Sequence, residues 1–166
     1  MGRLGVDVGG VIIELSDGDD DTSFFGPAYL RTPPVDGVVE ALAAVVPLFD
    51  EVHVVSKCAE PTERRTRHWL AHHGFHARTG IGPERLHFCR TRPEKGPIAA
   101  RLGLTHFVDD RLEVLGHLDT VPHRYLFRPR PDEVEAYREH LPGVRRVQSW
   151  PELAAELGAR REGAGR

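Results

Sequence analysis

The segment that most constrains the fold of this chain is a short apolar run that ends in an aspartate and two glycines. Residues 4–6 read Leu-Gly-Val, Asp7 follows directly, and Gly9 and Gly10 come shortly after. A continuous apolar run is typical of a buried parallel strand, and an acid at its carboxyl end lies where open α/β sheets bind ligands. An aspartate after a strand is also a common turn former or helix cap, so this segment alone leaves both interpretations open.

The rest of the chain alternates between short apolar strands and amphipathic helices. We expect five strands, near residues 4–6, 52–55, 86–88, 106–108 and 125–127, with helices between them and two more helices after the last strand. This alternation predicts an α/β three-layer Rossmann-like sandwich with a mostly parallel five-stranded sheet. Residues 1–158 are expected to form a single domain, and residues 159–166, which are mostly Arg, Gly and Ala, a disordered tail.

Composition excludes several classes of protein. The 166 residues carry a formal net charge of −3, so no broad basic field indicates nucleic acid binding. No apolar run is long enough to cross a membrane, and no signal peptide is visible. Cys58 and Cys89 are far apart in the sequence and are expected to be free thiols, which fits a reducing, cytoplasmic location.

Polar side chains recur where the predicted strands end. Asp7 follows the first strand, Ser56 the second, and Asp109 and Asp110 the fourth, while Lys95 opens the helix before the fourth strand. The carboxyl ends of parallel strands share one edge, so these residues predict a site for Mg²⁺ and phosphate. A lysine at a helix N-terminus opposes the helix dipole, and a bound anion would explain it. Taken singly, each residue also has an ordinary interpretation as a cap or a solvated side chain.

Together these residues resemble the four motifs of the haloacid dehalogenase-like hydrolase superfamily, whose members are mostly Mg²⁺-dependent phosphatases. Residues 7–12 match the first motif, residues 54–56 the second, Lys95 the third and residues 107–110 the fourth. The resemblance covers residues 4–127, most of the chain. It implies a Mg²⁺-dependent phosphohydrolase that acts on a phosphorylated substrate through an aspartyl-phosphate intermediate.

The resemblance also implies a metal site. Asp7 would be a metal ligand as well as the nucleophile, and the backbone carbonyl of Gly9 would be a second protein ligand. Asp110 would bind Mg²⁺ directly, with Asp109 beside it in a supporting or second-ligand role. The metal would offset the repulsion between a carboxylate nucleophile and a phosphate.

The implied catalytic residues are Asp7, Ser56 and Lys95. Ser56 and Lys95 would hold the transferring phosphoryl group, and the ammonium of Lys95 would stabilise its equatorial charge. A carboxylate nucleophile divides one difficult hydrolysis into two easier steps.

One position departs from the family pattern. Phosphatases of this family usually carry a second aspartate two residues after the nucleophile, which protonates the leaving group and then activates water; here that residue is Gly9. The substrate could have a leaving group that needs no proton, or Glu14, His87 or an aspartate of the acidic residues 17–21 could replace the missing acid. The third explanation is a catalytically weak or inactive domain that binds a phosphorylated ligand or partner.

The dehalogenase and phosphonate-cleaving branches of the superfamily also lack that second aspartate, so their chemistries stay open. Those branches use a helical cap domain, and the segment between the first strand and the first helix is too short for one. We therefore expect an uncapped site, which within the family favours large phosphorylated substrates.

Three further groups of residues have open interpretations. His68 and His72 lie one helical turn apart, a spacing that zinc sites use, but the glutamate of a metalloprotease motif is missing. The acidic residues 17–21 read as a solvated loop, with metal binding as the alternative. The basic residues Lys57, Arg90 and Arg92 follow predicted strands, either as a rim that steers an anionic substrate or as a solvated loop edge.

Overall fold

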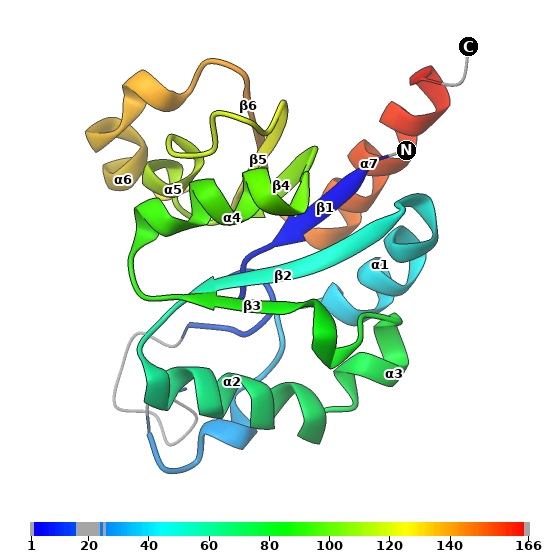
Figure 1. Ribbon diagram of the computed structural model, residues 1–166, viewed down its shortest axis with the longest axis vertical. Coiled ribbons are helices and arrows are strands. Elements are labelled where there is room, and N and C mark those ends of the chain that lie inside the picture. The colour runs from blue at the N-terminus through cyan, green and yellow to red at the C-terminus, as the bar shows by residue number, and fades with distance from the viewer. Residues whose placement is uncertain (1, 16–23, 25, 165–166) are drawn as a thin grey trace.

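A six-stranded parallel sheet forms the centre of the molecule. The computed structural model describes residues 2–15, 24 and 26–164, and for residues 159–164 the backbone alone. The strand order within this part of the chain is β3-β2-β1-β4-β5-β6, with every neighbouring pair parallel (Figure 1). The strands are β1 Arg3–Val6, β2 Glu51–Lys57, β3 Leu86–Cys89, β4 His106–Asp109, β5 His123–Phe127 and β6 Val144–Val147.

Helices cover both faces of the sheet, as Figure 1 shows. The layer on one face consists of α1 Val38–Val45, α2 Glu60–His72, α3 Phe75–Thr79 and α7 Trp150–Ala164. The layer on the other face consists of α4 Lys95–Leu102, α5 Leu112–Leu115 and α6 Pro131–Ala136. Short 3-10 turns complete the connections at Tyr29–Arg31, Val46–Leu48, Pro83–Arg85, Arg92–Glu94 and Arg138–His140.

Two apolar cores lie against the two faces because successive strand residues point in opposite directions. On β2, Val54 belongs to the core beneath α1, α2 and α7, whereas Val55 belongs to the core beneath α4 and α5. Phe107 and Val108 divide in the same way on β4. The central strands β1, β4 and β5 are mostly buried on both sides, which explains why they read as continuous apolar runs in the sequence.

Two buried tryptophans hold the segment that follows β1. The indole nitrogen of Trp150 donates a hydrogen bond to the carbonyl oxygen of Val11 at 2.7 Å, and that of Trp69 donates to Thr32 at 2.9 Å. Both side chains are almost fully buried. The packing of α7 is therefore coupled directly to the turn that carries the first motif, and the packing of α2 to a later part of the connection between β1 and α1.

The α/β Rossmann-like prediction is confirmed, with two corrections to its extent. The sheet has a sixth strand, β6, because residues 144–147 pair with β5 at the sheet edge although two arginines occupy its middle. Helix α7 continues to Ala164, so the structure extends this helix through residues 159–164, beyond residue 158, where the sequence analysis ended the domain. Residues 165–166 lie outside the described part of the chain.

Candidate active site

Three carboxylates meet at the carboxyl ends of the two central strands. Asp7 directly follows β1, Asp109 ends β4, and Asp110 comes next. The amide of Asp7 donates to the carbonyl oxygen of Val108 at 3.0 Å, which joins the two strand ends. An oxygen atom from each of the three side chains lies within 4.8 Å of the others. Strands β2 and β3 lie on one side of β1 and strands β4 to β6 on the other, so the strand order reverses between β1 and β4, and open α/β sheets bind ligands at such switch points.

Lys95 lies between two of these carboxylates. Its ammonium nitrogen is 2.8 Å from Asp7 Oδ1 and 2.8 Å from Asp109 Oδ2, and its side chain is 2% exposed. The preceding 3-10 turn is fixed by a capping box in which Glu94 accepts hydrogen bonds from the amide and hydroxyl of Thr91. A bound anion was expected to explain a lysine at this helix N-terminus. The carboxylates of Asp7 and Asp109 supply the negative charge instead.

Burial, together with crowding of negative charge, raises the pKa of two aspartates. Burial, followed by the charges of Asp7 and Asp109, raises the pKa of Asp110 to about 9. Burial and the charge of Asp7 raise the pKa of Asp109 to about 6, although Lys95 opposes this shift. Burial alone would lower the pKa of Lys95, yet Asp109 and Asp7 hold it above its ordinary value. Without a metal, the single positive charge of Lys95 therefore cannot balance three ionised aspartates.

The two glycines after Asp7 differ in their conformation. Gly10 has a φ of 76°, and a Cβ atom there would lie 2.7 Å from Asp110 Oδ2, so this position requires glycine. Gly9 does not have positive φ, and a Cβ atom there would meet Leu15 at 3.4 Å, an ordinary van der Waals contact. The backbone therefore permits a side chain at the position where the family's second aspartate stands.

A cavity of about 390 Å³ opens above the carboxylates. Gly9, Ser56 and Lys95 line it together with the three aspartates, so the structure brings all of the predicted site residues to one place. Its other walls are largely apolar and include Ile13, Leu15, Phe24 and Val114. Phe24, which packs edge-on against Tyr29, is thus part of the cavity wall.

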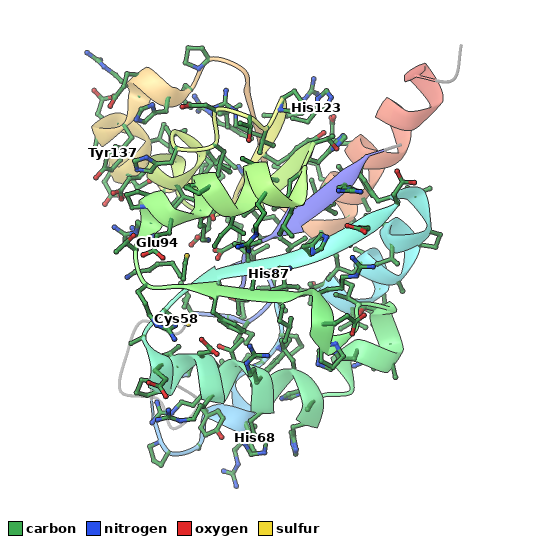
Figure 2. The ribbon with its side chains drawn as sticks, in the orientation of Figure 1. Cys58, His68, His87, Glu94, His123 and Tyr137 are labelled. Atoms are coloured by element: carbon green, nitrogen blue, oxygen red, sulfur yellow. The ribbon has the colours of Figure 1, made fainter. Side chains whose placement is uncertain are left out.

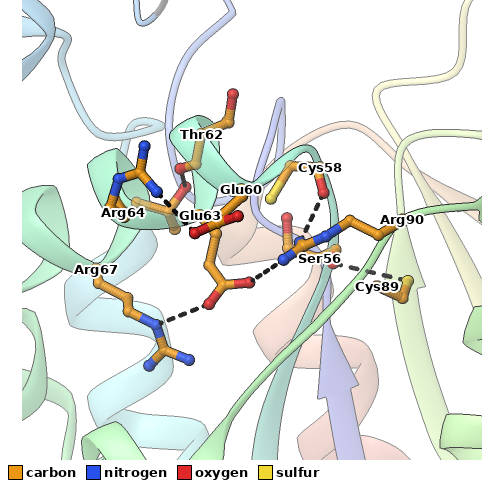
Figure 3. A network of polar contacts seen from close by, with 10 residues as sticks. Ser56, Cys58, Glu60, Thr62, Glu63, Arg64, Arg67, Cys89 and Arg90 are labelled. Carbon is orange, nitrogen blue, oxygen red and sulfur yellow. Dashed lines mark hydrogen bonds and ion pairs between the residues drawn. The ribbon is translucent and has the colours of Figure 1, made fainter.

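The basic residues around the cavity differ from those expected. Lys57 and Arg92 line it, and so does Arg111, which the sequence analysis missed. Arg90 is instead held by Glu63 at 2.9 Å and by the carbonyl oxygen of Cys58 at 2.9 Å, as Figure 3 shows. Arg111 directly follows the fourth motif in the sequence, and this position was the one sequence feature that could have indicated its place at the cavity.

Neither described substitute for the missing acid reaches the cavity. Glu14 forms an ion pair with Arg128 at 2.9 Å. His87 lies on β3 (Figure 2), where its Nε2 is 2.9 Å from His53 Nδ1 on the face covered by α4. The acidic residues 17–21, the third alternative, lie outside the described residues.

The histidines of α2 form no metal cluster in the part of the chain that the structure describes. His68 Nδ1 is 2.6 Å from the hydroxyl of Tyr29, and Figure 2 shows His68 on the outer side of α2. The three aspartates at the strand ends are the single group of three metal-type ligands among the described residues. Cys58 and Cys89 are free and buried, which confirms the expectation of thiols.

Several solved structures share the whole architecture of this chain. A D,D-heptose bisphosphate phosphatase from B. bronchiseptica, complexed with magnesium and phosphate, aligns with a TM-score of 0.63 at 17% identity, covering 96% of this chain and 99% of its own. The chain has the haloacid dehalogenase-like fold. A hydrolase of this fold from Deinococcus radiodurans R1, with bound phosphate and sodium, gives a TM-score of 0.63 at 14% identity, covering 95% of this chain and 96% of its own.

A third structure of the haloacid dehalogenase-like fold is the cobalt-bound deoxy-D-mannose-octulosonate 8-phosphate phosphatase from Haemophilus influenzae. It aligns with a TM-score of 0.57 at 14% identity, covering 98% of this chain and 90% of its own. By sequence, no protein-family model and no curated protein matches the chain significantly. No helix among the described residues combines the length and apolarity needed to cross a membrane. Identities this low establish the fold, so function has to be argued from the site itself.

Proposed function

We propose that this protein is a Mg²⁺-dependent phosphohydrolase that works through an aspartyl-phosphate formed on Asp7. The observation that carries the proposal is the placement of Asp7 beside Lys95 and two further carboxylates at the floor of a cavity. The solved structure with magnesium and phosphate has the same fold, which supports the assignment.

The donor set fits Mg²⁺. Magnesium prefers a small number of carboxylate oxygens and leaves positions for phosphate. Two buried carboxylates and a third that is partly buried, with one ammonium, leave negative charge to be balanced. Asp7, Asp110 and the carbonyl of Gly9 would hold the ion. Asp109 Oδ2 accepts from Lys95 and Oδ1 accepts from the amide of Arg111 at 3.0 Å, so Asp109 serves mainly to orient Lys95. When bound, the metal supplies charge neutralisation between the nucleophile and the phosphate.

The side chains of the site divide the remaining work. Asp7 attacks phosphorus with a carboxylate oxygen, and Lys95 keeps one of its three N–H donors for a phosphoryl oxygen after bonding Asp7 and Asp109. Ser56, which is 6% exposed, offers a hydroxyl from the end of β2. These donors are fixed by packing before substrate binds, which is the condition for electrostatic stabilisation of transferring charge.

We also propose that the site is uncapped and accepts large phosphorylated substrates. In the described residues, the connection between β1 and α1 contains only one 3-10 turn, Tyr29–Arg31, and the connection between β3 and α4 only another, Arg92–Glu94. Neither holds a separate helical layer over the cavity, which supports a substrate that extends beyond it.

One observation favours a second function, namely binding of a phosphorylated ligand without turnover. Gly9 removes the usual acid, and apart from the three aspartates no described carboxylate or imidazole lines the cavity. General acid–base catalysis is typically worth ~10²–10⁴-fold, so its loss could leave a slow enzyme or a binder.

A substrate screen separates the two functions. Purified protein is assayed against phosphorylated metabolites, a phosphonate and a haloacid, with Mg²⁺ and with chelator, and the Asp7→Asn variant is the matched control. Turnover that requires both Mg²⁺ and Asp7 supports the hydrolase. Saturable binding of a phosphorylated compound, with equal absence of turnover in wild type and Asp7→Asn, supports the binding function instead.

A further inference from the structure

Among the described residues that line the cavity, the proposed hydrolase has no spare carboxylic acid or imidazole to protonate a departing alkoxide. Among the described residues that line the cavity, Asp7, Asp109 and Asp110 are the carboxylates, and no imidazole is present. Asp7 and Asp109 are engaged by Lys95, and all three belong to the proposed nucleophile and metal set. A leaving group that departs as a stable anion needs no such donor and therefore fits this site best.

The cavity is also lined by three positively charged side chains that have no role in the phosphoryl transfer proposed above. Lys57 at the end of β2, Arg92 in the turn before α4, and Arg111 after β4 all line it, and we call these three residues the cationic rim. Among the described residues, the side chains of Lys57 and Arg111 have neither a hydrogen bond nor an ion pair, whereas Arg92 pairs with Glu113 at 3.0 Å. Three separate segments of the chain thus bring cations to the same cavity.

Charge balance indicates that the cationic rim binds a negatively charged part of the substrate. Among the groups at the strand ends, Lys95 and a divalent metal together would carry as much positive charge as the three aspartates carry negative charge. The negative charge of a substrate is then matched by the rim. A cation that faces a departing anion stabilises it in the transition state and replaces protonation as the means of dispersing its charge.

We propose that the cationic rim binds an anionic leaving group, and that the substrate is an anhydride of phosphoric acid: an acyl phosphate or a phosphoanhydride. The assignment rests on the proposed function of the same site. An oxygen of Asp7 attacks phosphorus, the bond from phosphorus to the bridging oxygen breaks, and its electron pair stays on the departing carboxylate or phosphate. Water then hydrolyses the aspartyl-phosphate, which regenerates Asp7 and releases phosphate and one proton to solvent.

Kinetics on chosen substrates test the leaving-group assignment. With Mg²⁺ present, kcat/KM is measured for acetyl phosphate, for pyrophosphate and for the alkyl ester glycerol 2-phosphate. We expect at least one anhydride to exceed the alkyl ester by ~10²-fold or more, the size of a missing general acid, and the favoured anhydride identifies carboxylate or phosphate as the leaving group. Comparable kcat/KM on the alkyl ester overturns the inference and leaves the proposed phosphohydrolase standing, whereas no turnover of any compound removes both.

Variants of the rim test its role, with a binding readout beside the kinetics. Lys57→Gln and Arg111→Gln should each lower kcat/KM on the favoured anhydride by ~10-fold or more, as expected for a hydrogen bond to a charged group. The control Arg138→Gln removes an exposed arginine that does not line the cavity and whose ion pair among the described residues is with Glu135. Titration calorimetry should show that the two rim variants bind methylenediphosphonate more weakly than wild type does, and that the control binds it as wild type does. Losses in the control equal to those in the rim variants, or no loss in either rim variant, would refute the assignment.

Discussion

Replacing Gly9 by aspartate should restore the missing acid to the site. Gly9 lines the cavity, its φ lies outside the left-handed region, and an added Cβ atom makes only a 3.4 Å contact with Leu15. The side chain therefore enters without backbone strain. The gain expected on an alkyl phosphate such as glycerol 2-phosphate is bounded by the general acid–base contribution, ~10²–10⁴-fold. The gain on p-nitrophenyl phosphate should be much smaller because its leaving group needs little protonation.

Two controls make this experiment decisive. Gly9→Asn has the same shape as Gly9→Asp but transfers no proton, so it isolates the acid from any effect of size. Gly10→Ala introduces a Cβ atom 2.7 Å from Asp110 at a φ of 76°, and it should lose stability and Mg²⁺ binding. Initial rates and melting temperatures are measured for each protein at saturating Mg²⁺. A stable Gly9→Asp protein that matches Gly9→Asn on both esters would refute the reasoning.

Three further predictions concern the charge cluster. Mg²⁺ should raise the melting temperature of wild type, because it binds the folded state, and Asp110→Ala should lose this response; an undiminished response would remove the assigned site. Without metal, the raised pKa of Asp110, about 9 against an ordinary 3.8, means that the folded protein binds more protons than the unfolded chain between these values. Stability should therefore fall as pH rises through that window, and melting curves of Asp110→Asn should show a shallower slope. Lys95→Met should lower the metal-free free energy of unfolding by about 3–5 kcal/mol, because it leaves Asp7 and Asp109 buried without their cation; urea titration measures this, and an unchanged midpoint would contradict it.

The site was predictable because its residues follow strands. Asp7, Ser56 and Asp109 occupy strand ends that a parallel sheet must bring to one edge, so sequence order and fold class were sufficient to group them. The pairing of Lys95 with two carboxylates was not predictable, because a distance of 2.8 Å depends on how α4 packs against the sheet. For the same reason Arg90 was expected at the rim, although Glu63 on α2 holds it elsewhere.

The missed elements have weak local patterns. Strand β6 contains Arg145 and Arg146 between two valines, and it is a strand because β5 offers it an unpaired edge. The C-terminal part of α7 extends a helix in which the buried residues among those with described side chains, Trp150, Leu153 and Leu157, lie between its start and its midpoint. Helix propagation costs little once the first turns are packed, whereas the composition of residues 159–166 alone indicated disorder.

The most direct test of the account is the identity of the phosphorylated residue. Wild type is incubated with Mg²⁺ and acetyl phosphate, quenched in acid and reduced with borohydride, which converts an aspartyl-phosphate to homoserine. Peptide mass spectrometry should find this conversion at position 7 in wild type and nowhere in Asp7→Asn. Conversion at another aspartate, or equal turnover by the two proteins with no conversion at Asp7, would contradict the proposed mechanism.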